Sequence, residues 1–237
     1  MNFPMKVEIG IIGAMQIEVE GLRAAMEQTE TEIVSGVEFV SGILYGHTCV
    51  VACCGVGKVF AALCAEAMIL RYQPDYILNT GVGGTLTECL SIGDIAVSRD
   101  VVQYDMDTSA IGDPVGLISG IDLVHIPANP DLCDRLTRAS VACGVNTLCG
   151  TVCSADLFLS DSEIKHRIVN QFGGVVCEME GGAIGHVCYV NRVPFCVLRS
   201  VSDCANGDSP EDFPAFTRRA AETSMRVLKQ FLTDARA

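Results

Sequence analysis

The segment KVEIGIIG at residues 6–13 and the segment MQIEVEGLRAAM at residues 15–26, separated only by Ala14, have two different hydrophobic patterns. The first is a nearly continuous apolar run, rich in β-branched residues and closed by glycine, which is typical of a buried strand. The second has apolar residues at helical spacing. A buried strand that leads into a helix is the repeating unit of α/β proteins, so this stretch predicts that class.

The same alternation continues along the chain. Further strands are predicted at residues 37–44, 48–54, 76–78, 95–103, 147–152, 174–177 and 194–201, and helices at 57–71, 131–143, 162–172, 180–190 and 213 to about 235. Tyr45-Gly46-His47 predicts a hairpin turn, and residues 105–130 an irregular loop. We therefore predict an α/β three-layer sandwich with a central twisted mixed sheet flanked by helices. The 237 residues contain no Pro/Ser-rich linker, so residues 1–237 are predicted to form a single domain.

Composition and charge exclude several classes of partner. The net charge of −13, with few and scattered Lys and Arg residues, would repel nucleic acid and anionic membranes. The longest apolar runs are far shorter than a membrane span, and residues 1–10 do not have the pattern of a secretory signal. We therefore expect a cytoplasmic protein with neither a nucleic-acid nor a membrane partner.

The cysteines do not have the pattern of a disulfide or metal framework. There are 13 of them, an odd number without an export signal, so most are expected to be reduced. The adjacent Cys53-Cys54 pair lacks CxxC spacing, and the four histidines form no ligand cluster. No metal is predicted.

Acidic residues recur just after the predicted strands. Ligands of open α/β sheets bind beyond the carboxyl ends of strands, so these positions are candidates for a site. They are Glu18, the glycine turn Gly81–Gly84, Asp156, Phe158, Glu178, Glu180, Ser202 and Asp203. Three acids at one sheet edge suit the cleavage of an N-glycoside, which needs a general base, a general acid and stabilisation of a sugar cation.

Each candidate also has a purely structural explanation. Asp203 could cap a turn, Glu18 could be an exposed helix residue, and Glu178 and Glu180 could favour a helix N-terminus. Arg199 is harder to explain in this way, because a guanidinium in an apolar strand requires a carboxylate partner.

With these positions in place, the order of segments resembles the 5'-methylthioadenosine/S-adenosylhomocysteine nucleosidases of the nucleoside phosphorylase superfamily. The resemblance covers nearly the whole chain. Its motifs are IIGAM (11–15) with EVE (18–20), GVGK (55–58), NTG (79–81), GDI (93–95), SADLF (154–158), EME (178–180) and VLRSVSD (197–203).

The resemblance implies a catalytic set of Glu18, Asp203, Glu180 and Arg199. Asp203 matches the general acid that protonates adenine N7, and Glu18 matches the general base that activates water, with Arg199 orienting it. Glu180 matches the carboxylate that holds the ribose hydroxyls. The implied substrate-binding residues are Met15, Val56, Val82, Gly83, Phe158, Leu159, Glu178, Met179, Ser202, Phe213, Thr108 and Ile111.

Within that set, Phe158 matches a platform on which adenine stacks, and the Leu159 backbone matches the group that contacts the purine edge. Met15, Val56 and Phe213 match an apolar lining around the sugar and the 5'-thio group. Thr108 and Ile111 match a region that reaches into a neighbouring subunit's pocket, so the resemblance also implies a homodimer. No cofactor is implied, and the expected ligand is a small adenine nucleoside.

The chain departs from the family pattern in three places. Val82 stands where relatives often have serine, and Thr108, Ile111 and Ser119 stand where some relatives have valine, phenylalanine and proline. Ala155 and Leu157 alter the usual glycine-aspartate-alanine run, whereas Asp156 and Phe158 keep their places.

Three other functions stay open at this point. A nucleoside phosphorylase would need cationic phosphate ligands where the turn at residues 13–18 offers an acid. A hydrolase for another nucleoside, such as futalosine, would keep the acids and change the purine-edge contacts. A nucleoside-binding protein without turnover would not need a protonatable acid opposite a general base.

Overall fold

The computed structural model describes residues 6–203 and 213–234, with side chains for all of these except residues 203, 213 and 214. Ten strands of this part of the chain form one mixed sheet. They are β1 (Ile9–Gly13), β2 (Glu27–Val34), β3 (Val37–Leu44), β4 (His47–Cys53), β5 (Tyr76–Thr85), β6 (Ile95–Gln103), β7 (Ile126–Pro127), β8 (Thr147–Ser154), β9 (Gly174–Glu178) and β10 (Phe195–Asp203). The helices are α1 (Gln16–Ala24), α2 (Lys58–Tyr72), η1 (Ser109–Ile111), α3 (Pro130–Ala142), α4 (Ser162–Phe172), α5 (Gly181–Asn191) and α6 (Phe213–Asp234).

The sheet is partly closed on itself. Its strands follow the order β10-β6-β8-β9-β5-β1-β4-β3-β2, and β10 also pairs with β5. The strands β10, β6, β8, β9 and β5 therefore form a closed ring, from which β1, β4, β3 and β2 extend as an open sheet. The predicted α/β class and mixed sheet are confirmed, but a three-layer sandwich describes only part of this barrel-like arrangement.

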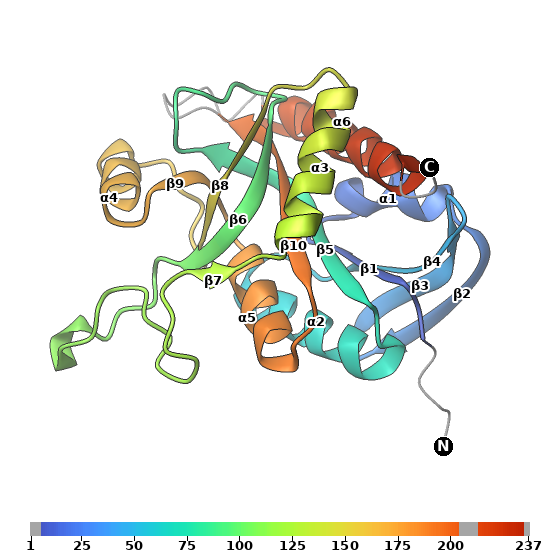
Figure 1. Cartoon of the computed structure of the whole chain (residues 1–237), viewed down its shortest axis with the longest axis horizontal. Helices are drawn as coiled ribbons and strands as arrows, with labels where there is room; N and C mark the ends of the chain where they lie inside the picture. Colours follow the sequence, from blue (N-terminus) through green and yellow to red (C-terminus); the bar gives the residue numbers. More distant parts are fainter. Residues whose placement is uncertain (1–5, 204–212, 235–237) are drawn as a thin grey trace.

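Helices cover both faces of the sheet (Figure 1): α1, α3 and α6 lie on one side, and α2 and α5 on the other. Successive side chains of a strand point to opposite faces, so each central strand serves both layers. In β1, Ile11 packs into the apolar cluster beneath α1 and α6, whereas Ile12 packs into the cluster beneath α2. This double burial explains why residues 6–13 are apolar without strict alternation, and the predicted buried strand followed by a helix is confirmed.

Two strands were not predicted from the sequence: β2, and the two-residue β7, which lies in the segment predicted to be an irregular loop. The β2 strand has the sequence EQTETEIV, is largely exposed, and lies at the open edge of the sheet, where it pairs only with β3. An edge strand needs few apolar side chains because much of its surface faces water, and charges there discourage pairing between molecules. The apolar pattern therefore could not reveal it.

The glycine segment Gly81–Gly84 is also different from the prediction. It lies inside β5 and pairs in parallel with β10, so that Gly81 is opposite Arg199 and Gly83 is opposite Val201. The predicted turn at these glycines is therefore wrong. No helix in the described part of the chain is long and apolar enough to cross a membrane.

Candidate active site

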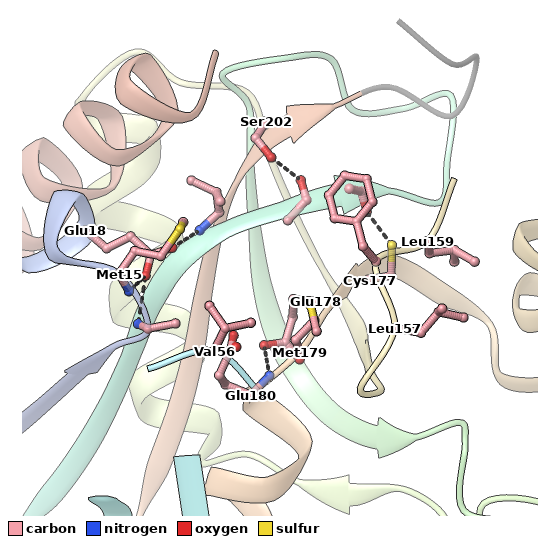
Figure 2. Close-up of a pocket in the computed structure, with 15 residues that line it drawn as sticks. Met15, Glu18, Val56, Leu157, Leu159, Cys177, Glu178, Met179, Glu180 and Ser202 are labelled. Carbon is pink, nitrogen blue, oxygen red and sulfur yellow. Dashed lines mark hydrogen bonds between the residues drawn. The ribbon is translucent and has the colours of Figure 1, made fainter. Parts of the chain in front are cut away.

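A cavity of about 230 Å³ opens where β1, β5, β9 and β10 end. Carboxyl ends of neighbouring strands are the usual place for a ligand site in α/β folds. Figure 2 shows the side chains that surround it, with Glu18 and Met15 on one side and Leu157 and Leu159 on the other. The lining residues are Ala14, Met15, Glu18, Val56, Val82, Gly83, Gly84, Leu157, Phe158, Leu159, Cys177, Glu178, Met179, Glu180 and Ser202.

Glu18 is a buried carboxylate held by backbone N–H groups. It lies in the first turn of α1 with 3 % of its surface exposed. Its Oε2 accepts hydrogen bonds from the N–H groups of Ala14 at 2.7 Å and Met15 at 2.9 Å, and its Oε1 accepts one from Val82 at 3.0 Å. Burial raises the pKa of Glu18, and the charge of Arg199 and these N–H groups oppose the rise. The result is a positioned carboxylate that is more basic than an ordinary glutamate.

Arg199 lies at the centre of the polar part of the site. Only 1 % of its surface is exposed, and its Nη2 donates a hydrogen bond to Asn79 Oδ1 at 2.7 Å. The same nitrogen forms a short ion pair with Glu178 and lies 3.5 Å from Glu180 Oε2. The prediction that this guanidinium has a carboxylate partner is confirmed.

The resemblance implied that Arg199 orients Glu18, and the structure shows which groups each of the two contacts directly. Its ion pairs are with Glu178 and Glu180, whereas Glu18 is oriented by the three backbone N–H groups. Arg199 acts on Glu18 through its charge, because it is the largest influence that lowers the pKa of Glu18.

Gly81 allows Glu18 and Arg199 to approach each other. A Cβ atom added at Gly81 would lie 2.7 Å from Glu18 Oε1 and 3.0 Å from Arg199 Nη1. Any side chain there would displace both charged groups. Glycine is therefore required at position 81 because the side chains of Glu18 and Arg199 come close to its Cα atom. The backbone there is part of a strand and forms no turn.

The carboxylates of Glu178 and Glu180 form a second charged unit. Glu178 accepts hydrogen bonds from the Ser154 hydroxyl and from the backbone N–H groups of Glu180 at 3.0 Å and Gly181 at 2.7 Å. Glu180 Oε1 accepts one from the Gly57 N–H at 2.9 Å. Burial, followed by the charge of Glu178, raises the pKa of Glu180 to about 7.

The rest of the cavity wall is mainly apolar. Met15, Val56, Met179 and Leu159 face the cavity together with Phe158. Phe158 is 59 % exposed, so its ring is not part of the packed core. An exposed ring at the cavity wall offers a flat surface on which a planar base can stack.

The structure brings most of the predicted site residues to this one cavity. Glu18, Glu180, Met15, Val56, Val82, Gly83, Phe158, Leu159, Glu178, Met179 and Ser202 line it, and Arg199 lies behind it. Thr108 and Ile111 do not line it, and Ile111 is 82 % exposed in the segment around η1. The side chains of Asp203 and Phe213 lie outside the described residues.

Asn79 is a site residue that the sequence reasoning did not identify. Its side-chain amide donates to the Ile12 carbonyl at 3.0 Å and accepts from Arg199, which fixes the guanidinium against β1. A polar residue inside a buried strand was the available signal, because such a side chain must find hydrogen-bond partners. Among the described residues, no group of three or more Cys, His, Asp or Glu side chains is placed to hold a metal ion.

Comparison with known proteins places the chain in a family. Residues 8–233 match the family model of the phosphorylase superfamily. A 5'-methylthioadenosine/S-adenosylhomocysteine nucleosidase from Shewanella loihica is 40 % identical over 95 % of this chain and 99 % of its own length.

Solved structures agree with this relationship. The nucleosidase of the same name from Colwellia psychrerythraea, in complex with adenine, has a TM-score of 0.90 and 31 % identity over 98 % of this chain and 96 % of its own. A futalosine hydrolase from Helicobacter pylori has a TM-score of 0.91 and 31 % identity over 96 % of this chain and 98 % of its own. The chain therefore belongs to the phosphorylase superfamily and, within it, to the family of the 5'-methylthioadenosine/S-adenosylhomocysteine nucleosidases.

Proposed function

We propose that this protein hydrolyses the N-glycosidic bond of 5'-methylthioadenosine and S-adenosylhomocysteine, and also of 5'-deoxyadenosine, releasing adenine and the 5'-substituted ribose. The observation that carries the proposal is the pair of charged units facing one cavity, Glu18 on one side and Glu178 with Glu180 on the other. The curated relative with that name, and the related structure in complex with adenine, support the choice of substrate.

In the proposed reaction the bond between adenine N9 and the anomeric carbon lengthens, and positive charge develops on the sugar. Glu180, held by the Gly57 N–H, holds the ribose hydroxyls and stabilises this charge. Glu18 takes a proton from a water molecule as its oxygen bonds to the anomeric carbon. Asp203 gives a proton to adenine N7, so the base leaves uncharged.

The apolar wall provides the binding surface in this proposal. Adenine stacks on Phe158, the Leu159 backbone contacts the purine edge, and the 5'-thio group lies against Met15 and Val56. Phe213 is proposed for the same apolar lining on the strength of the resemblance. Val82 has no hydroxyl, but its backbone N–H holds Glu18, a contact that does not depend on the side chain present.

Hydrolysis is favoured over phosphorolysis by the charges around the cavity. The described lining contains no lysine or arginine, and Arg199 is engaged with Glu178 and Asn79. A phosphate ion would have to approach the Glu18 carboxylate, which repels it. Water is therefore the proposed nucleophile.

A futalosine hydrolase is the second candidate. The Helicobacter pylori protein of that name has a backbone as similar to this chain as the nucleosidase does. Such an enzyme would use the same carboxylates and differ at the base and at the 5' substituent. Rates of base release from methylthioadenosine, S-adenosylhomocysteine, 5'-deoxyadenosine, futalosine and inosine separate the two, and the first candidate predicts that the adenine nucleosides are preferred.

Variants test the catalytic roles. Glu18→Gln and Asp203→Asn are expected to lower kcat for methylthioadenosine by about 100-fold or more while nucleoside binding persists, because each removes a proton transfer at nearly constant volume. Glu20→Gln is the matched control for Glu18, since Glu20 lies exposed in the same helix and should turn over normally. Full activity in either catalytic variant would remove that residue from its proposed role.

The proposal extends to the organisation of the molecule. The chain acts as one catalytic domain in the cytoplasm, a location supported by the free thiols of the described cysteines.

A homodimer is proposed because α2 exposes three apolar side chains close together on its surface, Val59, Phe60 and Leu63. In such a dimer Thr108 and Ile111 would reach the partner's cavity. Analytical ultracentrifugation tests this, and a monomer at micromolar concentration would contradict it.

A further inference from the structure

Two cysteines from different elements meet outside the cavity. Cys133 lies in α3 and Cys149 in β8, and their Sγ atoms are 2.7 Å apart. Both are free thiols. A disulfide bond has a length of about 2.05 Å, so a small movement of the side chains would bring the sulfur atoms to bonding distance.

The two thiols differ in their exposure. Cys149 is exposed to solvent, whereas Cys133 is buried with 6 % of its surface exposed. Burial, followed by the hydrogen bond with Cys149, raises the pKa of Cys133. An oxidant from solvent therefore reaches Cys149 first, and Cys133 is placed to react with the product.

The β6 strand and its residue Arg99 lie beside Cys149. Cys149 is opposite Val97 in the parallel pairing of β8 with β6, and Arg99 follows two residues later in β6. The Arg99 guanidinium donates to Asp100 at 3.0 Å and to Thr151 at 3.2 Å, and both thiols influence its pKa, although less than Asp100 does. Arg99 and its partners Asp100 and Thr151 therefore lie on the strands that position Cys149.

We propose that Cys133 and Cys149 form a reversible oxidation site that reacts with hydroperoxides. The Cys149 thiolate attacks one peroxide oxygen and the O–O bond breaks, which gives a sulfenic acid at Cys149 and, after protonation, one water molecule. Cys133 sulfur then attacks Cys149 sulfur, the S–O bond breaks, and a second water molecule leaves. Two thiols are oxidised to a disulfide, hydrogen peroxide is reduced to two water molecules, and an added thiol reverses the step.

The crosslink should stabilise the fold and leave the enzyme active. Neither cysteine lines the cavity, so substrate binding does not depend on them. The disulfide would close the segment of residues 134–148, and such a closure corresponds to a rise in Tm of about 6–12 °C for a chain of this size.

The test is peroxide treatment of the folded protein, alkylation of the remaining thiols, and mapping of tryptic peptides without reduction. Cleavage at Arg99, Arg135, Arg138 and Lys165 puts Cys133 alone in peptide 100–135 and Cys149 in peptide 139–165. The expected result is a link between these peptides that dithiothreitol removes, with the stated rise in Tm. Peptide 139–165 also contains Cys143 and Cys153, so fragment spectra or the Cys149→Ser variant must assign the link.

Three variants make the outcome decisive. Cys149→Ser, at an exposed position, should abolish the link, and Cys133→Ser should leave a sulfenic acid at Cys149 that reacts with dimedone. Cys89→Ser removes an exposed thiol elsewhere and should leave the link unchanged. Peroxide treatment that leaves Cys133 open to alkylation, or that joins Cys149 to another cysteine or another molecule, would overturn the proposal.

Discussion

At the scale of single residues, the site is built from carboxylates that are buried and hydrogen-bonded. Glu18 has three backbone N–H donors, and Arg199 joins Glu178 to Asn79. A buried charge is tolerated when it is paired and hydrogen-bonded, and the same burial shifts its pKa. Glu18 and Glu180, two of the groups that the proposed reaction needs, are therefore held in place before substrate binds.

The strand-end acids could be predicted from the sequence because ligand sites in α/β folds lie beyond the carboxyl ends of strands. Their partners could not. Asn79 and Gly81 lie in a strand that reads as ordinary apolar chain with a glycine cluster, and their roles depend on distances to Arg199 and Glu18 that only the folded chain defines. The ion pairs of Arg199 with Glu178 and Glu180 could not be predicted for the same reason.

Because Glu18 and Arg199 lie close to Gly81, adding a single methyl group at this position should reduce activity. Gly81→Ala should lower kcat/KM by about 100-fold or more, because the added Cβ displaces both Glu18 Oε1 and Arg199 Nη1. Gly120→Ala is the matched control, since a Cβ there has no neighbour within 4 Å. Steady-state kinetics of both variants checks the prediction, and near-normal activity of Gly81→Ala would show that the site tolerates the displacement.

Glu180 predicts a pH dependence of stability. Its folded pKa of about 7 lies above the ordinary glutamate pKa of 4.5, so between these values the folded chain retains a proton that the unfolded chain has lost. This contribution to the free energy of unfolding is fully present below pH 4.5 and is lost as pH rises through about 7. Its full size is about 3 kcal/mol as an order of magnitude.

Urea denaturation of the wild type and Glu180→Gln between pH 5 and 8 checks this. The free energy of unfolding of the wild type should fall relative to that of the variant as pH rises, because glutamine cannot titrate. Parallel pH profiles for the two proteins would mean that Glu180 has an ordinary pKa in the folded state.

At the scale of elements, β5 determines the site. Its first half packs as an apolar strand beside β1, and its glycine-rich second half lies beside β10 and β9. The sequence predicted the first half from its apolar run but took the second half for a turn, because glycines are common in turns. In the folded chain these glycines allow β5 to pack closely against its neighbours. That role depends on elements distant in sequence, so the local pattern could not predict it.

The packing of β5 against β9 predicts a loss of stability on adding a side chain. A Cβ at Gly83 would lie 2.9 Å from the backbone carbonyl oxygen of Cys177 in β9, and backbone cannot move aside as a side-chain tip can. Gly83→Ala should lower the free energy of unfolding by about 1–3 kcal/mol. Chemical denaturation measures this, with Gly120→Ala expected to stay within about 0.5 kcal/mol of wild type.

At the scale of the whole molecule, the closed ring of strands brings the residues of the active site together. Because β10 borders both β5 and β6, Glu178 at the end of β9, Glu180 just after it and Arg199 of β10 come within reach of α1, which follows β1. Local patterns predicted the order of strands and helices but contain no information on which distant strands pair, so the closed ring could not be predicted. The net charge of −13 and the acidic cavity together disfavour an anionic second substrate.

In the proposed reaction, a water molecule that Glu18 activates hydrolyses the N-glycosidic bond. The most direct test incubates the enzyme with methylthioadenosine in phosphate-free buffer and in buffer with phosphate, and identifies the sugar product by mass spectrometry. Hydrolysis predicts equal rates of adenine release in the two buffers, with free methylthioribose as the sugar product in both. Adenine release that requires phosphate and yields the sugar 1-phosphate would contradict it.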